Sequence, residues 1–460
     1  MRPVTTFYAH EGDYADLDIQ GAAERLSRAV QCRTVNDGSS DGEFAALRAL
    51  MRERYPAVME AGTFEVVGRS VLITLPGGDA SLRPCLFMSH QDVVDVVEGT
   101  EDDWRYPPFS GTIAEGYVWG RGTLDVKNQV FGLLEAAEYL LGHGRTFTRT
   151  VYLAFGEDEE TFNTGALAIS ELLQSRGVTL EFVLDEGDGE IAPGDAFGAP
   201  EQFVFQIALA EKGYADLELS VQSKGGHSSR PFGGTSLGRL SQAIARIVEH
   251  PFPAACSPVL QNAFRAAAPY VTQEPLRTLV QDVDANAQSI ADYCNQTPAL
   301  FPLTTTTIAP TMISGGSSAC NVMPQDMRAV INFRIAPGET AAGVMARCAA
   351  AVDDPAVRLR FLQANDPSEV ARCDGYGYAR VKAAMERYYQ DVVFLPSMSV
   401  GATDARRYEP ICDTCIRCAP FVSEGEDVHT GVHGTNERIS LRALAQGIRV
   451  LIHLMEDTCM

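Results

Sequence analysis

Residues 150–165 read TVYLAFGEDEETFNTG, and this stretch decides how the rest of the chain is interpreted. The apolar run at 151–155 predicts a buried strand, and the four acids at 157–160 follow directly after Gly156. A helical pattern begins at residue 166. Four adjacent carboxylates repel one another unless a cation offsets them, although a solvated acidic turn is the simpler alternative. Similar polar clusters follow other apolar runs, and they favour a bound cation over a solvated turn.

The same alternation of apolar runs and helical patterns fills the first 210 residues. The helical patterns lie at 18–33, 43–55, 129–141 and 166–175, and the apolar runs at 64–67, 70–75, 84–88, 151–155 and 180–184. This order is typical of a three-layer α/β fold. Strands that alternate polar and apolar positions follow, accompanied by helices on one face, and the first pattern then returns. We predict an α/β domain made of residues 1–210 and 371–460, interrupted by an inserted α+β domain at 211–370.

Polar side chains follow three of the apolar runs, and others lie in loops that reach the same edge. In open α/β sheets, ligands bind beyond the carboxyl ends of the strands. Two imidazoles and three carboxylates are expected there: His90, Asp125, Glu160, Glu186 and His433. Zinc takes nitrogen and oxygen ligands, and one catalytic zinc usually takes three protein ligands. Five residues therefore suit two metal ions if one carboxylate bridges them.

Two further acids lie next to these candidate ligands. Asp92 follows His90 by two residues, so it is well placed to accept the other ring N–H and orient the imidazole. Glu159 adjoins Glu160, but its side chain should point in a different direction from that of the candidate ligand. This makes Glu159 the candidate general base.

Composition limits the partners and the compartment. The chain has 460 residues, 45% of them hydrophobic, and a formal charge of −23, which argues against binding nucleic acid or an anionic membrane by bulk electrostatics. No apolar run approaches the roughly 18 residues of a membrane span. The 11 cysteines are irregularly spaced, so we interpret them as free thiols and predict a cytoplasmic protein. Cys412, Cys415 and Cys418 could form a zinc site, but structural thiols are the favoured interpretation.

Nine motifs in order now carry a family resemblance: HQD, WGRGTLDVKN, GEDEE, LDEG, GGHSSRP, NVMP, NFRIAPG, GATDARRY and HGTNERI. Together they resemble the co-catalytic zinc aminoacylase and carboxypeptidase family, which includes acetylornithine deacetylase, succinyl-diaminopimelate desuccinylase and cytosolic dipeptidases. The closest likeness is to the carboxypeptidase S and N-fatty-acyl-amino-acid hydrolase branch. The resemblance runs from about residue 80 to the C-terminus.

The resemblance implies a role for each candidate. The first zinc would be held by His90, Asp125 and Glu186, and the second by Glu160, the bridging Asp125 and His433. Glu159 would be the base that activates water, and Asp92 would orient His90. Asp185 is the rival to Glu186 as a ligand, and His429 is the rival to His433.

The inserted domain would act as a lid that contributes to the site. His227 in GGHSSRP would donate to the oxyanion, and Asn321 in NVMP would add a polar contact to the substrate. Arg406 would clamp the substrate carboxylate. Turn or surface roles are the alternatives for His227 and Arg406. In several relatives the histidine reaches across a dimer, which implies a homodimer through the lid.

The expected activity is zinc-dependent hydrolysis of the amide bond of a peptide or N-acyl amino acid with a free carboxylate. Two Zn²⁺ ions per chain are expected, with Co²⁺ or Mn²⁺ able to replace them. N-acyl-amino-acid deacylase and carboxypeptidase or dipeptidase activities both stay open, and a non-catalytic metal-binding protein is the alternative outside enzymes. One departure from the family pattern is DEETFNTG, where Phe162 and Asn163 occupy a turn in which relatives often have glycine.

Overall fold

The buried strand predicted at 151–155 is an interior strand, β6, of a nine-stranded mixed sheet. A computed structural model describes residues 6–187, 189–424 and 431–460. The sheet order is β1-β2-β6-β3-β7-β17-β9-β16, with β8 paired to β9. Its strands are β1 (Thr63–Val67), β2 (Ser70–Leu75), β3 (Cys85–His90), β6 (Val151–Gly156), β7 (Phe182–Asp185), β8 (Ile191–Pro193), β9 (Phe203–Glu211), β16 (Val392–Ser399) and β17 (Cys415–Arg417).

Three neighbouring strands of this sheet run in parallel and end at one edge. β3 pairs in parallel with both β6 and β7, so the carboxyl ends of the three strands meet. Alternate residues of β6 enter different cores: Leu153 belongs to one hydrophobic cluster and Ala154 to the other. A strand buried on both faces reads as a continuous apolar run, which explains why the sequence located β6 correctly.

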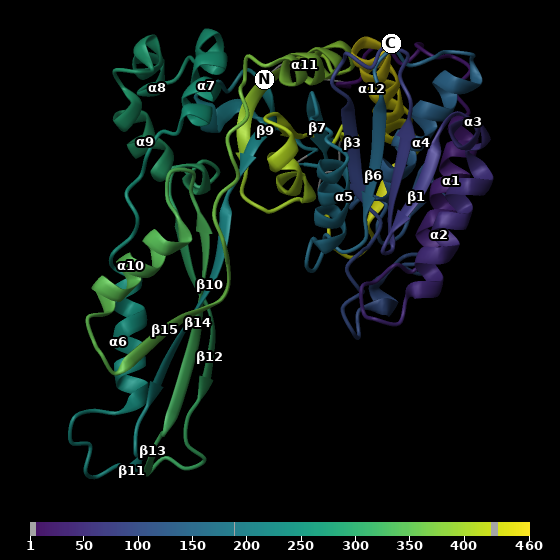
Figure 1. The fold of residues 1–460 in the computed structure, drawn as a ribbon. Coiled ribbons are helices and arrows are strands. Elements are labelled where there is room, and N and C mark those ends of the chain that lie inside the picture. Colours follow the sequence, from purple (N-terminus) through teal and green to yellow (C-terminus); the bar gives the residue numbers. More distant parts are fainter. Residues whose placement is uncertain (1–5, 188, 425–430) are drawn as a thin grey trace.

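Helices cover both faces of the sheet, which confirms the predicted three-layer fold (Figure 1). On one face α5 (Thr164–Ser175) and the 3₁₀ helix η6 (Asp404–Ile411) share a core with the sheet. The other face is covered by α1 (Ile19–Gln31), α2 (Asp41–Arg54), α3 (Pro56–Ala61), α4 (Lys127–Gly142), α11 (Tyr376–Tyr388) and α12 (Leu441–Cys459). The motif GATDARRY, at residues 401–408, includes the start of η6.

Loops beyond the sheet edge are organised by a small second sheet. Its order is β18-β5-β4, with β4 at Ile113–Ala114, β5 at Tyr117–Trp119 and β18 at Arg438–Ser440. Because β18 pairs with β5, the loop after β5 and the loop before β18 are held side by side.

The inserted domain projects away from the large sheet (Figure 1). Its sheet has the order β12-β14-β10-β15, formed by β10 (Gly213–Gln222), β12 (Thr307–Gly315), β14 (Asp326–Ile335) and β15 (Val357–Asn365). The helices α6 (Ser236–Val248) and α10 (Ala341–Val352) pack on this sheet and share a separate hydrophobic core with it. At the far tip, β11 (Gly226–His227) pairs with β13 (Val322–Met323).

The helical segment between α6 and β12 packs on the large domain. It comprises α7 (Pro258–Ala267), α8 (Leu276–Leu279) and α9 (Ala287–Asn295), with the 3₁₀ helices η3 (Ala268–Tyr270), η4 (Val280–Asp282) and η5 (Phe301–Leu303) between and after them. Its apolar side chains, among them Val259, Phe264 and Ile290, belong to the core of the large sheet. The division at residues 210 and 370 stays a prediction, but these helices share their core with the large domain.

Throughout the residues that the structure describes, no helix is both long enough and apolar enough to cross a lipid bilayer. The cytoplasmic location stays a prediction.

Candidate active site

The parallel strands deliver the candidate ligands to one edge of the sheet. His90 is the last residue of β3, and Glu186 follows the last residue of β7 directly. Glu159 and Glu160 follow β6 within a short turn. The sequence predicted that these residues gather at this edge of the sheet.

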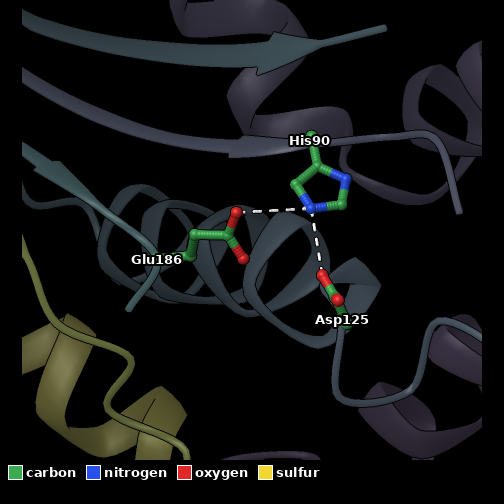
Figure 2. Close-up of side chains that lie close together, drawn as sticks. All are labelled: His90, Asp125 and Glu186. Atoms are coloured by element: carbon green, nitrogen blue, oxygen red, sulfur yellow. Dashed lines mark hydrogen bonds and ion pairs between the residues drawn. The ribbon is translucent and has the colours of Figure 1, made fainter. Parts of the chain in front are cut away.

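The first group of side chains is centred on His90 (Figure 2). Its Nε2 lies 3.1 Å from Oδ1 of Asp125 and 3.4 Å from Oε1 of Glu186. His90 is buried, whereas the two carboxylates are only partly buried. Solvent therefore reaches this group from the side of the carboxylates.

The second group uses the other oxygen of Asp125. Nε2 of His433 lies 3.0 Å from Oδ2 of Asp125 and 3.1 Å from Oε1 of Glu160. Asp125 thus faces both groups, one oxygen to each. His433 has a φ of 65°, a left-handed backbone that non-glycine residues rarely adopt, so its loop conformation is imposed by its surroundings.

The two groups fit a pair of divalent cations. In each group the potential ligand atoms lie within 4.8 Å of one another, and the donors are imidazole nitrogens and carboxylate oxygens, as zinc prefers. Burial and the Glu186 carboxylate raise the pKa of Glu159 well above its ordinary value. Burial likewise raises the pKa of Glu186 to about 7. Such crowding of carboxylates is electrostatically costly without cations and favourable with them.

Asp92 orients both the imidazole and the acidic turn. Nδ1 of His90 donates to the Asp92 carbonyl oxygen at 3.0 Å and lies 3.3 Å from its carboxylate. This leaves the lone pair of Nε2 facing Asp125 and Glu186, which is the tautomer that a metal ligand needs. The Asp92 carboxylate also accepts the N–H groups of Glu159 and Glu160, each at 3.1 Å.

Asp185, the rival to Glu186, has its carboxylate engaged elsewhere. It accepts the N–H groups of Ala405 and Glu186, both at 2.8 Å. It therefore fixes the end of β7 to η6, while the Glu186 side chain turns toward His90.

Sequence reasoning missed a buried ion pair that joins the two loops carrying Asp125 and His433. Arg121 Nη1 lies 2.6 Å from Glu437 Oε2, and both side chains are almost fully buried. Glu437 Oε1 accepts the N–H groups of Leu124 at 2.8 Å and Asp125 at 3.3 Å. Arg121 Nη2 donates to the His433 carbonyl oxygen at 3.1 Å. Arg121 and Glu437 stand inside two recognised motifs, but sequence spacing gave no sign that they pair.

The lid residues lie apart from these groups. His227 and Asn321 are both exposed and adjoin each other at the β11–β13 tip, where Ser228 N–H donates to the Asn321 carbonyl oxygen at 2.9 Å. This tip lies away from β3, the strand that ends at His90 (Figure 1). The structure therefore does not bring His227 or Asn321 to the metal-type groups of the same chain.

Arg406 contacts the connection between the two domains. Its Nη1 lies 3.2 Å from Oε1 of Glu211 and donates to Asn365 Oδ1 at 3.0 Å, and its Nη2 donates to the Asp366 carbonyl oxygen at 2.5 Å. Its neighbour Arg407 is also partly buried rather than a free surface charge.

The backbone conformation explains how the acidic turn forms without the glycine that relatives often have there. Asn163 has a φ of 54°, in the left-handed region where glycine is favoured and asparagine tolerated. Its amide donates to Asp404 Oδ1 at 3.0 Å, and the Phe162 side chain is exposed.

Other candidate ligands are not part of such a group. In the described part of the chain, only the two groups around Asp125 bring three potential metal ligands together. The cysteines at 412, 415 and 418 therefore do not form a metal site there. His429 lies outside the described residues.

Comparison with known proteins agrees with this geometry. The profile of "Peptidase family M20/M25/M40" matches residues 86–457. The chain is 34% identical to the N-fatty-acyl-amino acid synthase/hydrolase PM20D1.1 of Danio rerio over 94% of this chain and 84% of that protein. It is 30% identical to the probable carboxypeptidase S-like 2 of Dictyostelium discoideum over 98% of this chain and 87% of that protein.

Solved structures share the fold. The M20 family metallo-carboxypeptidase Sso-CP2 from Sulfolobus solfataricus superposes with a TM-score of 0.67 at 16% identity, covering 95% of this chain and 98% of that one. Human carnosine dipeptidase 1 gives a TM-score of 0.64 at 15% identity, covering 96% and 97%. The resemblance identified from the nine motifs, including its branch, is confirmed, and the chain belongs to peptidase family M20/M25/M40.

Proposed function

We propose that this protein is a dinuclear zinc hydrolase that cleaves the amide bond of an N-acyl amino acid or peptide with a free carboxylate. The observation that carries the proposal is Asp125, whose two oxygens face two separate imidazoles, His90 at 3.1 Å and His433 at 3.0 Å. A carboxylate in this position suits the bridge of a two-metal site. His90 and Glu186 would complete one set of ligands, and His433 and Glu160 the other.

Two bound zinc ions would polarise the amide carbonyl and lower the pKa of a bound water molecule. Glu159 accepts the proton of that water and returns it to the leaving amine. A carboxylate is a suitable acceptor and donor for this proton because it can both take it up and give it back within the closed site. Asp92 keeps the peptide groups of Glu159 and Glu160 in place through its carboxylate.

His227 donates a hydrogen bond to the oxyanion that forms from the carbonyl. Its Nδ1 accepts the Ser229 N–H at 3.2 Å, so the neutral ring carries its proton on Nε2 and presents a donor. Because His227 lies at the lid tip, it reaches an active site only by lid closure or from a second copy of the chain.

A homodimer through the lid is supported by its edge strand. β12 ends its sheet, and Met312 and Ile313 on it are 65% and 60% exposed. An unpaired strand edge with exposed apolar side chains is a ready surface for pairing with another chain. The proposed dimer uses this edge.

Arg406 and Asn321 are proposed to hold the substrate. Arg406 would bind the carboxylate of the amino-acid portion, in competition with its present partner Glu211. Asn321 would arrive with His227, since both belong to the lid tip.

The acyl portion of the substrate distinguishes two activities. One relative is named a fatty-acyl-amino acid synthase/hydrolase and another a carboxypeptidase S-like protein, and these names support an acyl-amino-acid or a peptide substrate respectively. The zinc-loaded protein should be given dipeptides, N-acetyl amino acids and N-fatty-acyl amino acids. Release of amino acid from acylated compounds alone identifies a deacylase, and release from dipeptides a peptidase. No release, with two zinc ions bound, identifies a metal-binding protein instead.

Glu159 is tested by the isosteric substitution Glu159→Gln. Turnover should fall by about 10²- to 10⁴-fold, because the proton acceptor is lost, while metal content measured by atomic emission stays at the level of the unmodified protein. Glu157→Gln is the matched control from the same acidic run, because Glu157 instead accepts the N–H of Arg69. Retained turnover in Glu159→Gln would exclude this residue as the base.

A further inference from the structure

Two cysteines that the active site does not use meet in a tight turn. Cys412 follows the end of η6 and Cys415 begins β17, and the chain bends at Asp413 between them. The two side chains lie close enough for each thiol to shift the pKa of the other. The Thr414 N–H also points to Cys412 Sγ at 3.4 Å. A turn of this kind holds two sulfur atoms close enough to be joined with little movement of the backbone.

The turn forms part of the wall of a cavity. Cys412, Asp413 and Thr414 line a cavity of about 500 Å³ together with Arg83 and Arg372. Both thiols are buried, at 5% and 3% exposure, and of the two only Cys412 lines this cavity. A small molecule in the cavity therefore meets Cys412 first.

The two sulfur atoms have unequal chemical environments. Hydrogen bonds from Cys415 and from the backbone of Thr414 lower the pKa of Cys412 although burial opposes this, whereas the hydrogen bond to Cys412 and burial raise the pKa of Cys415. The thiolate is the nucleophile in thiol chemistry, so Cys412 is suited to attack and Cys415 to resolve.

We propose that Cys412 and Cys415 are a redox-active dithiol that closes to an intramolecular disulfide by exchange with a low-molecular-weight disulfide. The Cys412 thiolate attacks one sulfur of the disulfide R–S–S–R, forms a mixed disulfide and releases RS⁻, which takes up a proton. Cys415 then gives up its proton, attacks the Cys412 sulfur and releases the second RSH. Two thiols are oxidised and one disulfide is reduced, so two electrons are transferred.

The position of the pair links it to the connection between the domains. β17 ends at Arg417, whose Nε lies 3.3 Å from Glu211 Oε2, and Arg406 of the preceding η6 pairs with the same carboxylate. The turn at 412–415 therefore joins two segments that both contact Glu211. The inference stands on this turn and cavity and does not depend on the proposed hydrolase activity.

The test is a mass measurement on the full chain. The folded protein is incubated with bis(2-hydroxyethyl) disulfide, quenched in acid, alkylated under denaturing conditions and digested with trypsin. Residues 408–417, YEPICDTCIR, should form one tryptic peptide that holds both cysteines. We expect this peptide to lose both alkylation sites and become two hydrogens lighter, and dithiothreitol to reverse the change.

Cys85 and Cys459 provide an internal control. These two thiols also shift each other's pKa and are buried like Cys412 and Cys415, but neither of them lines the cavity. They should stay open to alkylation under the same conditions. Full alkylation of the 408–417 peptide, or earlier oxidation of the Cys85–Cys459 pair, would overturn the proposal.

Two variants separate the roles of the sulfur atoms. In Cys415→Ser the mixed disulfide on Cys412 should accumulate, because the resolving thiol is absent. In Cys412→Ser no adduct should form on Cys415, because it does not line the cavity. An adduct on Cys415 and none on Cys412 would overturn the assignment. The measurement on the unmodified protein requires neither variant to fold.

Discussion

Asp92 illustrates how one residue can determine two features of the site. Its carbonyl oxygen accepts a hydrogen bond from Nδ1 of His90 and so fixes the tautomer, and its carboxylate accepts the peptide N–H groups of Glu159 and Glu160. The imidazole and the acidic turn are therefore oriented together, although they follow different strands. Buried carboxylates that accept several N–H groups are strongly preorganised because each lost bond leaves an unpaired buried group.

The Arg121–Glu437 pair yields a prediction about metal affinity. Glu437→Gln should weaken metal binding by about 10- to 100-fold, because it removes the charge that holds the Asp125 and His433 loops together. The measurement is competition for zinc with a chelating indicator, and turnover is read separately.

Glu138→Gln is the control for that experiment. Glu138 also accepts two backbone N–H groups, from Ala57 at 3.1 Å and Val58 at 2.9 Å, but it lies under α3 away from the site. Equal zinc affinity in the two variants would contradict a positioning role for Glu437.

Among the elements, the connection from β9 to β10 carries an unusual buried cation. Lys212 lies between the two strands, and its Nζ donates to the carbonyl oxygens of Pro302 at 2.9 Å and Thr305 at 2.7 Å. Burial, with a smaller effect of the positive charge of Arg334, lowers the pKa of Lys212 to about 7. In the unfolded chain the same group has a pKa of about 10.4.

This pKa difference predicts a rise of stability with pH. Between pH 7 and about 10 the unfolded chain binds more protons at Lys212 than the folded chain, so the free energy of unfolding increases with pH. Urea unfolding at pH 7 and pH 9 should show a larger increase for the unmodified protein than for Lys212→Met. Lys382→Met, at a partly exposed lysine paired with Glu386, should behave like the unmodified protein. Parallel pH dependences in all three would refute the effect.

Arg406 is predicted to bind the carboxylate of the substrate, although its present contacts lie beside the connection from β9 to β10. Arg406→Ala should lower kcat/KM by about 10- to 100-fold for a substrate with a free carboxylate, the loss of one charge-assisted contact. It should leave hydrolysis of the corresponding carboxamide nearly unchanged. An equal loss for both compounds would show that Arg406 acts by holding Glu211 and the domain connection.

At the scale of the whole molecule, the lid tip at β11 and β13 lies away from β3, β6 and β7, the strands that precede the metal-type groups (Figure 1). If a second copy supplies His227, two inactive variants should complement each other. Mixing Glu159→Ala with His227→Ala under conditions that exchange subunits should restore about a quarter of the activity, because random pairing makes half the dimers mixed and each mixed dimer has one complete site.

The edge of the lid provides the control for complementation. Ile313→Lys in both variants places charges on the exposed strand β12 and should prevent pairing, so activity should not return. Size-exclusion chromatography reports whether the dimer is lost. Absence of restored activity in mixed dimers without Ile313→Lys would mean that His227 acts within its own chain after lid closure.

The sequence by itself determined the layers of the large domain and the edge at which the ligands gather. Strands buried on both faces are continuous apolar runs, as at β6, and the residues that end parallel strands must meet. His90, Glu160 and Glu186 could therefore be grouped before any contact was known.

Only the tertiary structure decided the partners that come from distant loops. The pairing of β18 with β5 brings Glu437 under Asp125, and the packing of α7 assigns the segment after α6 to the large core. Neither follows from local periodicity, because hydrophobic spacing gives the exposed and buried faces of an element but not the element that covers it. The position of His227 at the lid tip is likewise a consequence of how the domains are joined.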